Sequence, residues 1–205
     1  MTHSSSDQVH DAAAFVRDVF RESARVKLAV ADSLAGEIAR AGEWIAEAYR
    51  TGGKTLLFGN GGSASDAQHI AAEWTGRLAR DRVALPSIAL TANTSDLTAI
   101  GNDYGFERIF ARLVEAHGRP GDVAVAISTS GRSPNVIAGV EEARARGLRS
   151  IGLVGKGGGK LANCVDLAIV IPCDDTQRIQ EAHITAAHSI AELVERLLFP
   201  QSEDA

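Results

Sequence analysis

Two pairs of polar side chains stand out in segments otherwise rich in alanine, leucine, isoleucine and valine. His69 and Glu73 lie four residues apart after a glycine-rich stretch, and Gln180 and His188 lie near the C-terminus. Residues i and i+4 of a helix share a face, so His69 and Glu73 are placed to act together. Imidazole and carboxylate groups bind divalent metal ions or move protons. If the fold brings the two pairs together, they form a reactive site.

Spacing alone leaves other interpretations of these residues open. A single histidine and glutamate at i,i+4 is usually a solvated pair on a helix surface. Near the C-terminus, helical spacing does not choose between His183 and His188 as the histidine that faces the site. Glutamine is also an uncommon zinc ligand. From spacing, metal binding is therefore one hypothesis among several.

The apolar pattern indicates the elements that must position these groups. Short apolar runs, most of them ending near glycine, serine or threonine, alternate with helical segments, which is typical of a parallel sheet. Right-handed crossovers place helices on both faces of such a sheet. We therefore expect a doubly wound α/β sandwich of five strands, and its five runs are TLLFGN, SIALTAN, VAVAISTSG, SIGLVG and LAIVIP.

Helical spacing of apolar residues dominates both ends of the chain, in the first fifty residues and from about Thr176 to Phe199. No repeat, linker or low-complexity stretch divides the sequence, so we expect one domain over residues 1–205. Within it we expect N-terminal helices over 1–52, the α/β sandwich over 53–199 and an acidic tail over 200–205.

Composition narrows the class of protein. A length of 205 residues with 45% apolar and 23% charged residues fits one globular domain with a sizeable core. Cys164 and Cys173 are too few for a disulfide framework, which favours a reducing compartment. The net charge of -5 and the lack of basic clusters argue against nucleic acid. Without a signal peptide or an apolar run of ~20 residues, we expect a cytoplasmic protein with no membrane contact.

Ligands of open α/β sheets bind beyond the carboxyl ends of the strands, and two loops there have suitable chemistry. In residues 59–65, glycines allow the backbone to approach a ligand, and we expect Ser63 or Ser65 to cap the next helix. Residues 128–134 carry hydroxyl groups and a glycine, with Pro134 set for the first turn of a helix. Either loop alone could be a simple helix cap. Together they favour a phosphorylated ligand.

Two nucleotide-binding patterns fit poorly. Gly59, Gly61 and Ala64 occupy the places of the dinucleotide fingerprint, but no acidic residue follows the next predicted strand to hold a ribose. Residues 155–160, GKGGGK, lack the spacing of a P-loop. We interpret them as a flexible turn that could fold over a ligand.

Four motifs carry a family resemblance: GNGGSASDAQHIAAEWTGR, LTAIGNDYGF, ISTSGRSPNV and RIQEAHITAAH. In their order and spacing the chain resembles the sedoheptulose 7-phosphate isomerases of the sugar isomerase (SIS) family, from about Val9 to Phe199. The resemblance implies a flavodoxin-like three-layer sandwich with a five-stranded parallel sheet and an N-terminal helical extension. It also implies a homotetramer with active sites at subunit interfaces, in which the N-terminal helices pack against neighbouring subunits.

The resemblance also implies roles for individual residues. Glu73 and His188 match the acid/base pair of the family, and His183 is left outside the site. One Zn²⁺ per subunit is expected at His69, Glu73, Gln180 and His188. The positions expected around the phosphate are Ser128, Thr129, Ser130 and Ser133. The positions expected around the sugar are Asn60, Gly61, Gly62, Ser63, Glu73, Asn102, Asp103 and Gln180.

The implied reaction converts sedoheptulose 7-phosphate to D-glycero-D-manno-heptose 7-phosphate through an enediol, the first step of bacterial ADP-heptose or GDP-heptose biosynthesis. Neighbouring enzymes decide whether the product enters lipopolysaccharide or another heptose pathway. The alternative is a non-enzymatic SIS relative that binds the bacterial replication initiator, whose end the tail LLFPQSEDA resembles. Both acid/base positions, Glu73 and His188, are filled here, which favours the enzyme.

Overall fold

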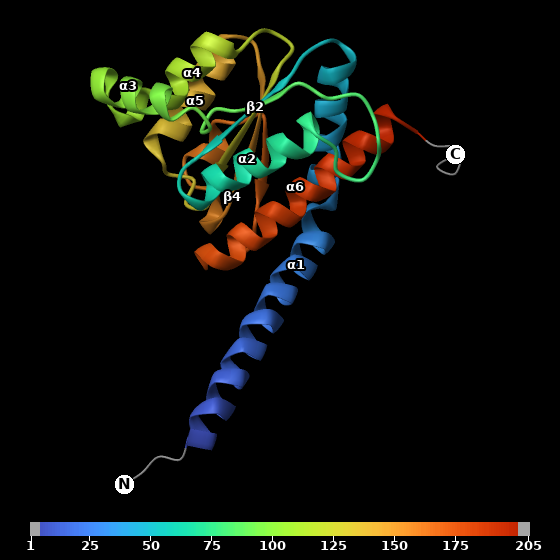
Figure 1. The fold of residues 1–205 in the computed structure, drawn as a ribbon, viewed down its shortest axis with the longest axis vertical. Helices are drawn as coiled ribbons and strands as arrows, with labels where there is room; N and C mark the ends of the chain where they lie inside the picture. The colour runs from blue at the N-terminus through green and yellow to red at the C-terminus, as the bar shows by residue number, and fades with distance from the viewer. Residues whose placement is uncertain (1–4, 201–205) are drawn as a thin grey trace.

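The computed structural model describes residues 5–200, with side chains from residue 12 onward, and centres on a five-stranded parallel sheet (Figure 1). Its strand order, β2-β1-β3-β4-β5, is that of a flavodoxin-like doubly wound sheet. The five predicted runs and the predicted fold class are confirmed. The predicted tail beyond Pro200 lies outside the described residues. The strands are β1 Thr55–Gly59, β2 Ser87–Ala89, β3 Val123–Ser128, β4 Arg149–Val154 and β5 Leu167–Val170.

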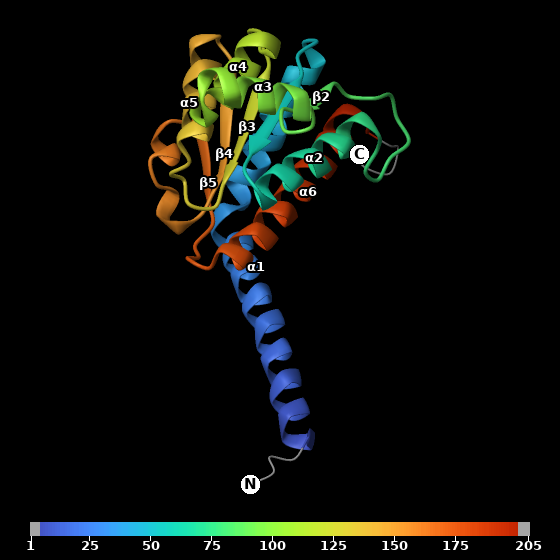
Figure 2. The ribbon, with the colours of Figure 1, turned by 60° about the vertical axis from the view of Figure 1, so that its left-hand side comes forward.

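Two layers of helices enclose the sheet (Figure 2). One layer packs the larger core cluster and consists of α1 Ser5–Arg50, α2 Gly62–Thr75 and α6 Thr176–Leu198. The other layer consists of α3 Thr94–Tyr104, α4 Ile109–His117 and α5 Pro134–Ala145. Short 3-10 turns, η1 Phe106–Arg108, η2 Lys156–Gly158 and η3 Leu161–Asn163, complete the connections. In residues 5–200, no helix combines the length and the apolar character needed to cross a membrane.

The strands are apolar on both sides because helices cover both faces of the sheet. Every residue of β1 and β3 is buried. Gly59 pairs with Ile127, and Ser128 pairs with Val154, so three central strands finish at the same edge. The strand order reverses between β1 and β3, and the loops after these two strands therefore meet where such sheets bind ligands.

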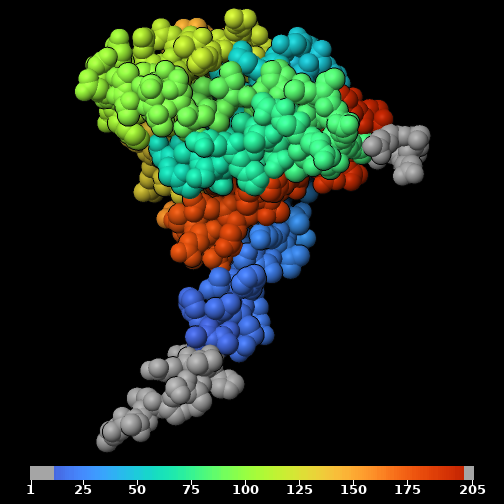
Figure 3. Space-filling view, in the orientation of Figure 1, coloured from blue at the N-terminus to red at the C-terminus, as the bar shows by residue number. Residues whose placement is uncertain are grey.

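The N-terminal extension is one continuous helix of 46 residues, α1, and not several. From Val26 onward, α1 contributes buried residues to the core that it shares with α6, among them Val26, Val30 and Ile45. The part before Val26 forms an arm that projects from the body of the molecule (Figures 1 and 3), and Arg178 of α6 bonds its Val19 carbonyl oxygen. On this arm, Phe15 and Phe20 are 68% and 72% exposed. The predicted helical extension is confirmed, although the N-terminal helices expected over residues 1–52 form a single helix.

Candidate active site

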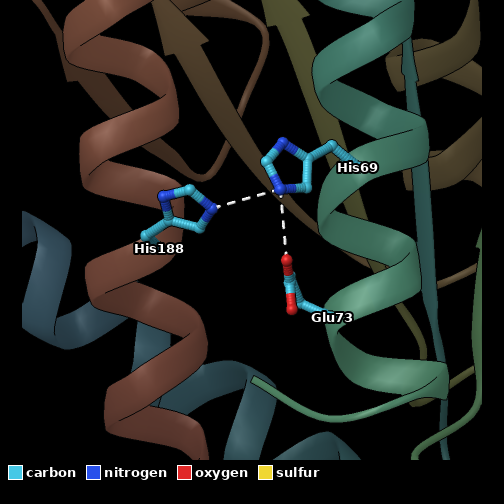
Figure 4. Close-up of side chains that lie close together, drawn as sticks. All are labelled: His69, Glu73 and His188. Atoms are coloured by element: carbon cyan, nitrogen blue, oxygen red, sulfur yellow. Dashed lines mark hydrogen bonds and ion pairs between the residues drawn. The ribbon is translucent and has the colours of Figure 1, made fainter. Parts of the chain in front are cut away.

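Three side chains that could transfer protons or bind a metal ion converge where α2 meets α6 (Figure 4). His69 and Glu73 come from α2, and His188 comes from α6. Nε2 of His69 lies 3.1 Å from Oε1 of Glu73 and 3.4 Å from Nε2 of His188. The two imidazole rings stand edge to face, with centroids 4.9 Å apart. The fold thus joins histidines that are 119 positions apart in the sequence.

The packing of α2 against α6 explains this placement. Both helices leave the carboxyl edge of the sheet, so they run in the same direction and lie side by side (Figure 2). Ile70, Trp74 and Ile190 point into the core and are at most 4% exposed. His69 and Glu73 each precede a core residue by one position, and their side chains are 48% and 20% exposed. The cluster therefore lies along the rim of the α2–α6 seam, within reach of solvent.

The donor set fits a zinc ion. Ligand atoms about 2.0–2.1 Å from a tetrahedral Zn²⁺ lie about 3.3 Å from one another. The two separations from Nε2 of His69, 3.1 Å and 3.4 Å, agree with that spacing. A single imidazole nitrogen carries at most one proton, so Nε2 of His69 cannot donate separate protons to both neighbours. A cation shared by all three groups would satisfy the cluster.

Gln180 lies apart from these three residues, at the beginning of the seam. A Cβ atom on Gly62 would overlap Nε2 of Gln180, so the amide of Gln180 lies against the N-terminus of α2. Gln180 and His188 are eight residues apart on α6, a rise of about 12 Å along the helix. One subunit thus brings together three of the four predicted zinc ligands. The fourth stays a prediction.

The structure separates the two histidines that helical spacing could not distinguish. His188 joins the cluster, whereas His183 is fully buried beside Val154 at the end of β4. Burial lowers the pKa of His183 from 6.5 to about 4, because the charged ring loses its hydration inside the protein. His183 therefore stays neutral in the folded protein above about pH 4 and takes no part in the cluster.

We expect the free energy of unfolding to fall as the pH drops from 6.5 to about 4, because of His183. In this window the unfolded ring binds a proton and the folded ring does not, so acid favours the unfolded state, by up to about 3 kcal/mol. Urea unfolding at several pH values measures the slope. In the variant His183→Gln, which cannot titrate, most of the slope should vanish. An unchanged slope would assign the effect to other groups.

The hydroxyl loop, residues 128–133, connects β3 to α5. Oγ of Ser128 lies 3.2 Å from Oγ of Ser133 and accepts a hydrogen bond from the amide of Gly131. Pro134 occupies the first turn of α5, as predicted. Hydroxyl groups thus gather at a helix N-terminus, an arrangement that suits a phosphate group. All four predicted phosphate residues belong to this loop, namely Ser128, Thr129, Ser130 and Ser133.

The turn after β4 supports the hydroxyl loop. Its first residues form η2, and its backbone packs against Gly131. Gly131 has a φ of 61°, and a Cβ atom there would overlap the carbonyl oxygen of Gly158. The amide of Leu161 donates to the carbonyl oxygen of Gly131 over 2.9 Å. The GKGGGK segment, expected to be a flexible turn, is thus packed against the loop that it supports.

The prediction that Ser63 or Ser65 caps α2 is wrong. The residue before α2 is Gly61, with a φ of 56°, and no side chain caps the helix. Ser63 lies inside the first turn and is 4% exposed. Backbone carbonyls of Asn60 and Gly61 accept the amides of both serines, so the turn closes without a side-chain cap. Gly61 and Gly62 are exposed, which leaves their backbone open to a ligand.

An asparagine pair joins the two loops at the point where the strand order reverses. Nδ2 of Asn60 donates to Oδ1 of Asn135 over 2.8 Å, and Nδ2 of Asn135 donates back over 2.9 Å. The side chain of Asn60, expected to contact the sugar, is therefore already engaged in holding the loop. Asn135 is 2% exposed and was missed in the sequence. The available signal was a second asparagine just after the hydroxyl loop, in the first turn of α5.

A cavity of about 520 Å³ opens between the glycine-rich loop and α3, lined by Asn60, Gly61, Thr98 and Gly101 among others. The predicted sugar residues Asn102 and Asp103 follow Gly101, are exposed, and hydrogen-bond to each other over 2.8 Å. They lie in the other helix layer from the His/Glu cluster (Figure 1). The structure thus places them on α3, next to the cavity-lining Gly101, and not in the cluster.

Comparison with known proteins adds to this picture. Residues 19–155 match the family model of the SIS domain. The chain is 53% identical over 187 residues to the phosphoheptose isomerase of Aquifex aeolicus. The matched region covers 91% of this chain and 98% of the relative. It is 52% identical over 187 residues to the phosphoheptose isomerase of a Roseiflexus species, and the matched region covers 91% of this chain and 95% of that relative.

Solved structures give the same result. The phosphoheptose isomerase of Neisseria gonorrhoeae superposes with a TM-score of 0.85 at 43% identity, covering 90% of this chain and 98% of that chain. The phosphoheptose isomerase of Francisella tularensis superposes with a TM-score of 0.87 at 34% identity, with the same coverage. Nearly the whole of each relative is matched.

Proposed function

The chain belongs to the SIS-domain family and, within it, to the phosphoheptose isomerases, and from this premise we propose that it interconverts sedoheptulose 7-phosphate and D-glycero-D-manno-heptose 7-phosphate. This isomerisation is the first step of bacterial ADP-heptose or GDP-heptose biosynthesis. The observation that carries the proposal in the structure is the meeting of Glu73 and His188, from two distant helices, in one cluster.

The reaction needs an acid and a base at neighbouring carbons of the sugar. A base removes a proton from C1 while an acid protonates the carbonyl oxygen at C2, which gives the enediol. The enediol then gains a proton at C2 and loses the proton of the C1 hydroxyl, which leaves an aldehyde at C1. We assign these transfers to the carboxylate of Glu73 and the imidazole of His188, because a carboxylate can accept a proton and an imidazole can accept or donate one.

We propose one zinc ion per subunit, held by His69, Glu73, Gln180 and His188. Three of these donors converge in one subunit, which supports a three-residue core for the site. When bound, zinc would polarise substrate oxygens or fix the orientation of its ligands. Glu73 and His188 belong to both the acid/base pair and the metal site, so metal-free and zinc-loaded protein must be compared.

We propose that the hydroxyl loop holds the 7-phosphate, at the opposite end of the substrate from C1 and C2. Its hydroxyls and the N-terminus of α5 supply hydrogen-bond donors for a phosphate group. Gly62 and Gln180, in contact at the beginning of the α2–α6 seam, are then placed to contact the middle of the sugar. This assignment separates binding of the phosphate from proton transfer.

Binding of a replication initiator, the alternative function, has less support. The relatives at 52–53% identity are phosphoheptose isomerases along nearly their whole length. Both acid/base residues, Glu73 and His188, are present and adjacent. Cytoplasmic location and the absence of nucleic-acid and membrane partners stay predictions.

We propose that the enzyme is a homotetramer with active sites at its interfaces. On α1, Phe15, Phe20 and Leu28 are 68%, 72% and 66% exposed. A groove of about 320 Å³ between α1 and α6, lined by Val30 and Ile38 among others, offers further apolar surface to a neighbouring subunit. Light scattering should give the mass of a tetramer. A stable monomer at micromolar concentration would contradict the proposal.

The decisive test is turnover with and without metal. The purified protein is stripped with a chelator, incubated with sedoheptulose 7-phosphate, and followed by NMR for heptose 7-phosphate before and after zinc is added. We expect turnover that zinc restores, because His69, Glu73 and His188 form a zinc-compatible cluster. Equal turnover of stripped and zinc-loaded protein would support the acid/base assignment and contradict a role for the metal ion in turnover. No turnover in either state would refute the proposed isomerase activity.

A further inference from the structure

A buried carboxylate near the end of α6 holds the chain segment that follows α2. Glu195 is 0% exposed. Its Oε1 accepts the backbone amide of Leu78, and its Oε2 accepts the amides of Ala79 and Arg80, each over 3.0 Å. These amides hold the pKa of Glu195 below its ordinary value, although burial acts in the opposite direction. Glu195 is therefore a charged anchor in the interior.

Arg82 links this anchor to the last turn of α2. Its Nε donates to Oε1 of Glu195 over 3.1 Å, and both side chains are 1% exposed. The same guanidinium group donates to the backbone carbonyl oxygens of Glu73 and Trp74, each over 2.8 Å, and to that of Gly76 over 3.0 Å. Arg82 thus satisfies carbonyl groups at the C-terminus of α2 that the helix itself leaves without partners.

Both ends of this connection carry a residue of the proposed active site. Arg82 bonds the backbone of Glu73 itself. Glu195 follows His188 by seven residues, two turns along the same side of α6. The connection therefore runs from His188 along α6 to Glu195, across to Arg82 and back to Glu73.

We infer that Arg82 and Glu195 are positioning residues that hold Glu73 and His188 in register for proton transfer and metal binding. The inference rests on the proposed function. A buried ion pair adds little net stability compared with apolar residues of the same size, so stability alone is a weak reason for this one. Small displacements of reacting groups, by contrast, reduce rates about 100-fold. The pair fixes one helix relative to the other where such a displacement would arise.

The test compares Glu195→Gln with a matched control, Asp122→Asn. Asp122 is also a buried carboxylate, 3% exposed, which accepts the amides of Lys54 and Arg119 and pairs with the ammonium group of Lys54. It lies at the amino edge of the sheet, before β3 begins, and bonds none of the residues of the connection. Both changes remove a buried charge, but only Glu195→Gln touches the connection to the cluster.

Three quantities are measured for each variant: kcat and KM per folded molecule, zinc affinity by calorimetry, and the ¹⁵N NMR signals of His69 and His188. We expect Glu195→Gln to lower kcat and zinc affinity about 10- to 100-fold and to shift both histidine signals, with KM nearly unchanged. Asp122→Asn should lose stability but keep kcat, zinc affinity and histidine signals. If both variants lose only stability, the inference is overturned.

Arg82→Lys is the second test variant, to be used if Glu195→Gln does not fold. Lysine keeps a positive charge beside Glu195 but cannot bond the carbonyl groups of Glu73 and Trp74 at the same time. The same loss of kcat and zinc affinity is expected, and wild-type values in a folded Arg82→Lys protein would overturn the inference. Wild-type protein without isomerase activity would refute the proposed function alone, because zinc affinity and histidine signals still report the positions of Glu73 and His188.

Discussion

Replacing Glu73 with glutamine should lower kcat about 10²- to 10⁴-fold, the range that a positioned acid or base contributes. Glutamine has the size of glutamate and can still contact Nε2 of His69, but it cannot take up a proton. The side chain is 20% exposed and lies at a rim, so the fold should survive the change. NMR turnover of sedoheptulose 7-phosphate measures kcat, and circular dichroism and light scattering verify fold and assembly.

Glu192→Gln is the control for that variant. Glu192 lies on α6, one helical turn after His188, is 47% exposed and pairs with Arg196. Its replacement should leave kcat within a factor of about two, since exposed pairs contribute little. Near-normal turnover of Glu73→Gln, with the control also active, would contradict the assignment of Glu73 as an acid/base residue.

Replacing Gly131 with alanine should raise KM about 10- to 100-fold, with a much smaller change in kcat. A Cβ atom at this position would overlap the carbonyl oxygen of Gly158, and the φ of 61° is unfavourable for alanine. The hydroxyl loop must then shift, and each lost hydrogen bond to a charged phosphate costs about 1.5–3 kcal/mol. Kinetics with substrate and calorimetry with inorganic phosphate measure the effect.

Gly157→Ala separates loop displacement from simple backbone strain. Gly157 lies in the supporting turn and has a φ of 71°, but a Cβ atom there would meet nothing within 4 Å. This variant carries the same conformational cost without the overlap, so its KM should stay close to that of the wild type. If Gly131→Ala binds phosphate as tightly as Gly157→Ala does, the hydroxyl loop is not the phosphate site.

The sheet was predictable because its physical signal is local. Strands covered on both faces must be apolar throughout, and the runs that became β1 and β3 are buried at every position. The N-terminal region was harder, because apolar spacing does not show whether two stripes belong to one helix. Gly36 interrupts the apolar pattern in the second half of this region, yet α1 continues through it, with open space around that glycine.

The site was predictable only in part. The i,i+4 spacing indicated that His69 and Glu73 share a face, but their partner on α6 depended on burial, which separates His183 from His188. The family resemblance, and not spacing, selected His188. Residues such as Asn135 matter through contacts with distant segments, and no local pattern marks those contacts. Likewise, the absence of a side-chain cap on α2 depends on backbone geometry at Gly61.

The distance in sequence between the two halves of the cluster has a consequence for biosynthesis. A chain emerging from the ribosome releases α2 early and α6 only after all five strands, so the sheet can begin to fold before His188 is available. Until α6 docks, His69 and Glu73 are an ordinary pair on one helix. With the roles proposed for His188, the metal site and the acid/base pair are therefore completed late, and a nascent chain that stops short of α6 lacks one residue of each.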